Sequence, residues 1–176
     1  QAKKGHLNVA QVIRCILLCE QTKFDEALGI LKVLPVEIAK LPFVPRLKAD
    51  IYFDMKDYSR AEKLYLEVTG GKLPYESSIY SRLGEIYMLS NKPENARDLF
   101  LKAIELDNRN IMAHFYLGDI YKLLGDKAKA QQEYGICASI DFGSTISKTA
   151  QQKLFLLTCE AGAAPGNPSG SPTNQT

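Results

Sequence analysis

The stretch Ile111–Asp141 reads IMAHFYLGDIYKLLGDKAKAQQEYGICASID and decides the fold of this chain. It contains two amphipathic segments that join at Gly125-Asp126. The residues that share one helical face are Leu117, Gly118 and Tyr121 in the first segment, and Ala130, Tyr134 and Cys137 in the second. Neither segment can bury this face alone. The pattern therefore predicts that the two helices fold back on each other as a helical hairpin.

The same pattern recurs along the chain at a period of about 34 residues. Four alanines mark this period, and a large side chain follows each one four residues later: Ala27 with Leu31, Ala61 with Tyr65, Ala96 with Phe100, and Ala130 with Tyr134. A small residue at a fixed place lets two helices approach closely, while the larger residue fills the adjacent gap. The period indicates a helical repeat array in which Ala96 and Ala130 are core spacers.

These residues resemble the tetratricopeptide repeat family, whose pattern in outline is W-x₂-L-G-x₂-Y, then A-x₃-F, then P. Two units match it well: Tyr80, Leu83, Gly84, Tyr87, Ala96 and Phe100 in one, and His114, Leu117, Gly118, Tyr121, Ala130 and Tyr134 in the other. The two earlier units, around Ala27 and Ala61, are degenerate, and Asn108 and Phe142 stand where the closing proline belongs. The resemblance implies an all-α fold, a right-handed superhelical α-solenoid of antiparallel helix pairs, and it implies no shared chemistry.

The repeats and the composition of the two ends divide the chain into four parts. Residues 1–8 are a polar lead-in, and residues 9–142 hold about four helix pairs. Residues 143–160 are expected to form a last helix whose polar face suits the end cap that repeat arrays need. Residues 161–176 are rich in Gly and Pro and have no large apolar residue, which predicts a disordered tail.

Composition and charge argue against several classes of protein. With 22 basic and 20 acidic residues the formal net charge is only +2, which argues against nucleic-acid binding. No apolar run approaches the roughly 18 residues that span a bilayer. Four cysteines without a C-x-x-C pair favour a reducing, cytoplasmic location, although a removed signal peptide would also fit a chain that begins at Gln1.

No arrangement of residues points to catalysis, a metal or a cofactor. The chain has neither a G-x-S-x-G nor an H-E-x-x-H sequence, and no phosphate-binding glycine loop. With only His6 and His114 available to assist the cysteines, a zinc site is not expected. His114 lies on the core-facing stripe, where a packing role is expected. The chain is therefore predicted to be a scaffold for protein–protein interaction and not an enzyme.

The resemblance implies that the first helix of each pair lines a concave groove for a peptide or helix of a partner. The first-helix residues expected to face it are Asp50, Phe53, Asp54, Ser81, Glu85, Met88, Met112, Phe115, Asp119 and Lys122. Asp50, Glu85 and Asp119 recur at the repeat period and so occupy equivalent places on successive helices. Carboxylates mixed with flexible or flat apolar groups suit a basic amphipathic segment.

A second interpretation makes these acids ordinary members of intrahelical ion pairs. Arg46 stands four residues before Asp50, Arg82 three before Glu85, and Lys122 three after Asp119. Both interpretations remain open at the level of sequence.

Chaperone adaptors of this family hold a C-terminal carboxylate with cationic and amide side chains on their first helices. The corresponding places here include Val12, Ile16, Arg82, Met112 and Tyr116, of which one is cationic. That subclass is not expected.

The helix expected at Val9–Cys19 has only Gln11 and Arg14 as polar residues. Such a helix is more apolar than a single buried stripe requires. An upstream element, a second copy of the chain or a partner is expected to cover its remaining surface. With a second copy, the alternative function is structural self-assembly, with this helix as the contact of a homo-oligomer.

Overall fold

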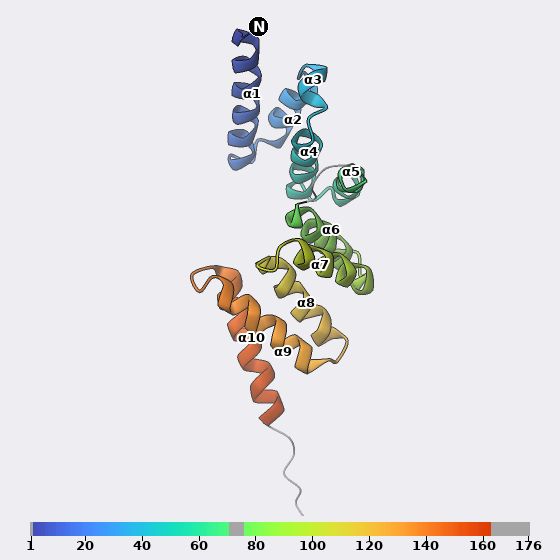
Figure 1. Cartoon of the computed structure of the whole chain (residues 1–176), viewed down its shortest axis with the longest axis vertical. Coiled ribbons are helices and arrows are strands. Elements are labelled where there is room, and N and C mark those ends of the chain that lie inside the picture. Colours follow the sequence, from blue (N-terminus) through green and yellow to red (C-terminus); the bar gives the residue numbers. More distant parts are fainter. Residues whose placement is uncertain (1, 71–75, 163–176) are drawn as a thin grey trace, which may run out of the picture. The chain divides into compact units, whose positions relative to one another are not determined.

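The computed structural model describes residues 2–70 and 76–162, and these residues form helices and connecting turns only (Figure 1). The helices are α1 (Ala2–Glu20), α2 (Phe24–Lys32), α3 (Val36–Ala39), α4 (Phe43–Asp54), α5 (Tyr58–Thr69), α6 (Ser77–Leu89), α7 (Pro93–Leu106), α8 (Ile111–Leu123), α9 (Lys127–Ile140) and α10 (Thr145–Gly162). The predicted all-α class is confirmed. The chain divides into two compact units after Asn108.

The turn between the two helices of each pair has one recurring backbone conformation. The middle residue of this turn has a positive φ in all four pairs: 58° at Thr22, 63° at Lys56, 56° at Asn91 and 80° at Gly125. These positions follow the same register as the alanines. Two of the helices that follow begin with polar caps, since the Asp57 and Asp126 side chains accept hydrogen bonds from Arg60 N and Lys129 N.

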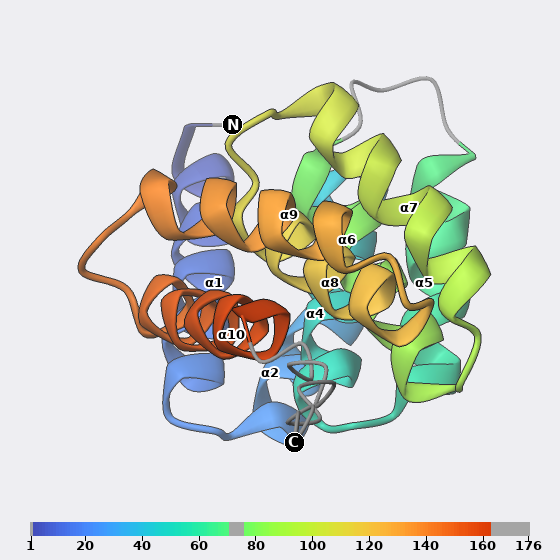
Figure 2. The same cartoon turned by 90° about the horizontal axis from the view of Figure 1, so that it is seen from below.

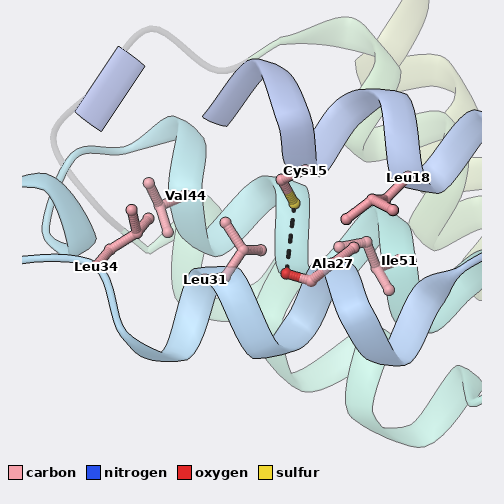
Figure 3. Close-up of a cluster of buried hydrophobic side chains, with 7 residues drawn as sticks. All are labelled: Cys15, Leu18, Ala27, Leu31, Leu34, Val44 and Ile51. Atoms are coloured by element: carbon pink, nitrogen blue, oxygen red, sulfur yellow. Dashed lines mark hydrogen bonds between the residues drawn. The ribbon is translucent and has the colours of Figure 1, made fainter. Parts of the chain in front are cut away.

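In the first unit, the second helix of one pair also packs against the first helix of the next pair. Cys15 and Leu18 of α1, Ala27 and Leu31 of α2, and Ile51 of α4 belong to one buried cluster (Figure 3). The Cys15 thiol donates a hydrogen bond to the Ala27 carbonyl at 3.5 Å, and burial raises its pKa to about 12. This cysteine is therefore a core residue and an unreactive one.

A second cluster repeats the arrangement one pair further on. Ala49 and Phe53 of α4, Ala61 and Tyr65 of α5, and Ile86 of α6 belong to it. Ile51 in the first cluster and Ile86 in the second are thus both covered by the second helix of the preceding pair.

The second unit consists of α8, α9 and α10. Figures 1 and 2 show α9 and α10 side by side. Ala150 and Leu157 of α10 are buried with Ala130 and Tyr134 of α9. The Ser147 hydroxyl of α10 donates a hydrogen bond to the Cys137 carbonyl at 2.9 Å, which ties the last helix to the pair before it.

The predicted spacers are confirmed, because Ala96 and Ala130 are fully buried, as are Ala27 and Ala61. The glycines of the two good units serve the same purpose. A Cβ atom on Gly84 would lie 2.7 Å from the Phe100 ring, and one on Gly118 would lie 2.5 Å from the Tyr134 ring. The aromatic ring of the second helix therefore lies directly on the backbone of the first.

The two end helices have bounds that can be compared with the expected divisions of the chain. The first helix begins at Ala2 and includes most of the polar segment 1–8, because that segment contains good helix formers such as alanine, lysine and leucine. The last helix runs over Thr145–Gly162, close to the predicted 143–160. Most of the predicted disordered tail, residues 163–176, lies outside the described residues.

Candidate functional site

The first helices of the first unit line a row of three adjoining hollows. The first is entirely apolar, has a volume of about 200 Å³, and is lined by Val9, Val12, Ile13, Ile38, Leu41 and Phe43. These side chains come from α1, from α3 and the turn after it, and from Phe43 at the start of α4. They are held there because α1 and α4 both pack on α2 and expose their remaining faces.

The second hollow has a volume of about 300 Å³ and is charged. Its polar lining is Cys19 of α1, Arg46, Asp50 and Asp54 of α4, and Ser78 and Arg82 of α6. A third hollow of about 170 Å³ shares Val12 and Phe43 with the apolar one, and Arg46 and Asp50 with the charged one. The three hollows therefore form one groove along α1, α4 and α6, apolar at one end and charged at the other.

Asp50 is the most firmly held acid of the groove. It accepts a hydrogen bond from the Tyr65 hydroxyl at 2.5 Å, and its Oδ2 lies 3.5 Å from Arg46 Nε. Burial raises the pKa of Asp50, while the hydrogen bond and Arg46 oppose that rise. Burial beside Asp50 also raises the pKa of Tyr65, which keeps its hydroxyl protonated as a donor.

The other charges of the groove are held more loosely. Arg82 lies 4.3 Å above the Phe53 ring and 3.9 Å from Asp54, whose side chain is 45% exposed. Arg46 also pairs with Glu76. In the part of the chain that the structure describes, Glu85 makes no hydrogen bond or ion pair.

In the second unit, the equivalent acid has partners of its own. Asp119 accepts a hydrogen bond from the Tyr134 hydroxyl and one from Lys153 Nζ of α10 at 2.5 Å. Lys153 also lies 4.3 Å above the Phe115 ring. The predicted groove residues Met112 and Phe115 are half-buried, and Lys122 is exposed.

The expected ion pairs are therefore only partly present. Arg46 does pair with Asp50, as the spacing predicted. Arg82 reaches Asp54 on the neighbouring helix instead of Glu85, and Asp119 is paired with Lys153 instead of Lys122. Lys153 stands one repeat period after Asp119. The repeat position that Asp50, Glu85 and Asp119 occupy on successive first helices is therefore occupied by a base on α10.

The structure places the predicted groove residues of the first unit in two groups. Asp50, Glu85 and Met88 are half-buried and Asp54 is exposed, whereas Phe53 and Ser81 are buried. Phe53 is covered by Tyr58 and Arg82, and Ser81 is only 6% exposed, so neither side chain is open to a ligand.

One wall of the groove contains none of the predicted acids. Val12, Ile16 and Cys19 of α1 line it together with Arg46. The repeat register predicts this wall, because Ile16 stands one repeat period before Asp50 and so occupies the equivalent place on α1.

Two segments of the chain match family models described as tetratricopeptide repeat, over residues 77–110 and 99–132. No curated protein matches the chain. Within the described ranges 2–70 and 76–162, no helix has the length and apolar character needed to cross a membrane.

Solved structures with the same fold cover most of the chain. The MamA protein has a TM-score of 0.71 at 20% identity, over 90% of this chain and 84% of its own. YrrB, described as a tetratricopeptide repeat protein with an unusual peptide-binding site, has a TM-score of 0.67 at 15% identity, over 88% of this chain and 78% of its own. The first such domain of Spaghetti (RPAP3), bound to the HSP90 peptide SRMEEVD, has a TM-score of 0.60 at 19% identity, over 70% and 94%.

Proposed function

This chain belongs to the tetratricopeptide repeat family, and from that premise we propose that the groove of α1, α4 and α6 holds a peptide or helix of a partner protein. Repeats of this family are non-catalytic modules for binding proteins, so the chain is an interaction scaffold and not an enzyme. The observation that supports this groove as the site is the continuity of an apolar hollow with a charged one.

The groove suits an amphipathic segment. An apolar side chain of the partner fits the hollow between α1 and Phe43, because that hollow has no polar lining and burying a large apolar side chain contributes about 1.5–3 kcal/mol. Two carboxylates, Asp50 and Asp54, and two guanidinium groups, Arg46 and Arg82, line the charged hollow. Glu76, which pairs with Arg46, adds a third carboxylate beside it. A basic side chain of the partner suits this end.

The Spaghetti domain binds a peptide that ends in an acidic run. We do not extend that ligand to this chain, because Arg46 and Arg82 already have carboxylate partners within the groove. The four unpaired cysteines support the cytoplasmic location proposed from the sequence.

Phe43→Asp tests the groove. Phe43 is 41% exposed and lines two of the hollows, so the substitution should leave the helical content unchanged and weaken partner binding by about tenfold or more, as expected for losing a buried aromatic anchor. Partners are captured from source lysate on the whole chain and quantified. Phe142→Asp is the matched control, because Phe142 is 71% exposed and lies in the other unit. Equal capture by both variants would rule out this groove.

Self-assembly is the second candidate, and one face of α1 favours it. Leu17 stands one repeat period before Ile51, and Ile51 and Ile86 are each covered by the second helix of the preceding pair. Leu17 is 49% exposed, and Ile13, one turn before it and also part of the lining of the apolar hollow, is 53% exposed. This face of α1 therefore has the chemistry of a helix-packing surface.

Ile16 and Leu17 differ in their surroundings on α1, so substitutions at these two positions distinguish the functions. Ile16 lines the groove, whereas Leu17 does not. If α1 assembles copies of the chain, Leu17→Asp lowers the mass measured by light scattering across a concentration series, and Ile16→Asp does not. A mass that stays that of one chain at all concentrations in the unmodified protein contradicts self-assembly.

A further inference from the structure

We infer that Asp54 and Glu85 select the charge of the partner in this groove, and that Asp50 is a positioning residue. This inference rests on the proposed function and narrows the partner to one class. That class is an amphipathic segment that carries a lysine or arginine beside its apolar anchor.

Asp50 has little capacity left for a ligand. One carboxylate oxygen accepts the Tyr65 hydroxyl at 2.5 Å, and the other lies 3.5 Å from Arg46. Its side chain is 28% exposed. Because both oxygens are engaged by the chain itself, a partner cation must compete with contacts that are already made.

Asp54 and Glu85 keep their carboxylates available. The one ion pair of Asp54 in the described residues is at 3.9 Å, near the limit for such a contact, and its side chain is 45% exposed. The side chain of Arg82, which would otherwise neutralise Glu85 on the same helix, lies instead over the Phe53 ring. Glu85 stands seven residues after Ser78 and three after Arg82, so it continues the α6 face that lines the charged hollow.

A comparison between repeats supports the division of roles. Asp50 with Tyr65 and Asp119 with Tyr134 are both 15 residues apart, and each aspartate accepts the tyrosine hydroxyl. The residue at the same distance after Glu85 is Phe100, which has no hydroxyl. At this repeat position, an aspartate accepts a hydrogen bond from the tyrosine of the second helix in two repeats. In the third repeat a glutamate stands there, opposite a phenylalanine that cannot donate one. Glu85 is the member of the row whose carboxylate the hairpin does not use.

The arginines of the hollow make an anionic partner the less favourable choice. Arg46 contacts both Asp50 and Glu76, and Arg82 is stacked on Phe53 beside Asp54. A partner carboxylate would have to compete with Asp50, Asp54 and Glu76 for these two arginines, whereas a partner cation can pair with the loosely held Asp54.

The experiment measures charge preference with the whole 176-residue chain. Two synthetic amphipathic peptides share their apolar positions and carry either lysine or glutamate at the others, and a third peptide ends in an acidic run with a free carboxylate. Affinities are measured by fluorescence anisotropy at two salt concentrations. The variants are Asp54→Asn, Glu85→Gln and Asp50→Asn, and Glu67→Gln on the exposed face of α5 is the control.

The lysine peptide is expected to bind most tightly, and more weakly as salt rises. Asp54→Asn and Glu85→Gln are each expected to reduce the lysine-to-glutamate preference about two- to fivefold. Asp50→Asn is expected to lower the melting temperature and to reduce that preference less than the other two variants do, because its carboxylate is already engaged by Tyr65 and Arg46. Glu67→Gln is expected to change neither the preference nor the melting temperature. The preference is a ratio of affinities, so a general loss of structure does not imitate the effect.

Two results overturn the inference while leaving the groove in place: a preference that changes as much in Asp50→Asn as in the other two variants, or tighter binding of either acidic peptide. The second result would assign the hollow to Arg46 and Arg82. If the lysine peptide does not bind, or if Phe43→Asp does not weaken its binding, the proposed function itself is overturned, and this inference with it.

Discussion

Gly118→Ala is expected to lower the free energy of unfolding by about 1–3 kcal/mol, although alanine is a better helix former than glycine. The new methyl group would lie 2.5 Å from the Tyr134 ring, which is fully buried. The ring cannot move aside without cost, because its hydroxyl is bonded to Asp119. Overpacking therefore outweighs the gain in helix propensity.

Gly135→Ala is the matched control for this substitution. Gly135 lies in α9, and a Cβ atom there would meet nothing within 4 Å. The same chemical change is thus expected to raise the free energy of unfolding by about 0.5–1 kcal/mol. Chemical denaturation followed by circular dichroism measures both values. If the free energy of unfolding changes in the same direction in both variants, the Tyr134 ring does not lie as close to the α8 backbone as described.

Ala130→Leu is expected to destabilise the chain by about 1–3 kcal/mol, because it adds bulk at a fully buried position between α9 and its neighbours. Ala128→Leu places the same side chain at an exposed position of α9, and its effect is expected to stay within about 0.5 kcal/mol. Thermal melts of the two variants make the comparison. Equal melting temperatures would contradict the role of the alanine register.

The fold was predictable because its determinants lie on single helices at a fixed period. The alanines and the large residues four places later define which faces are buried, and all four alanines are fully buried. The groove was harder to predict, because its charges are settled by contacts between helices. Tyr65 contacts Asp50 across a hairpin, and Arg82 contacts Asp54 across the boundary between two pairs. Neither contact follows from the rule that residues four apart on one helix are neighbours.

Two signals in the sequence would have improved the prediction of the groove. An aspartate paired with tyrosine 15 residues later occurs twice, while Glu85 faces Phe100, and this difference separates the bonded acids from the unbonded one. Lys153 stands at the repeat position of Asp119, which indicates that the row of acids ends there. The burial of Phe53 had no such signal, since it depends on Arg82 and Tyr58 covering the ring.

The left-handed turn residues bear on how diverged members of such families are recognised. Thr22, Lys56, Asn91 and Gly125 share one backbone conformation at the repeat period, yet only one of them is the glycine that this conformation favours. The family models match residues 77–132, which leaves the turns at Thr22 and Lys56 outside the matched segments. The same backbone geometry thus occurs in helix pairs that the family models do not match. A search for distant relatives that scores this torsion angle and its period would find helix pairs that a profile of residue types overlooks.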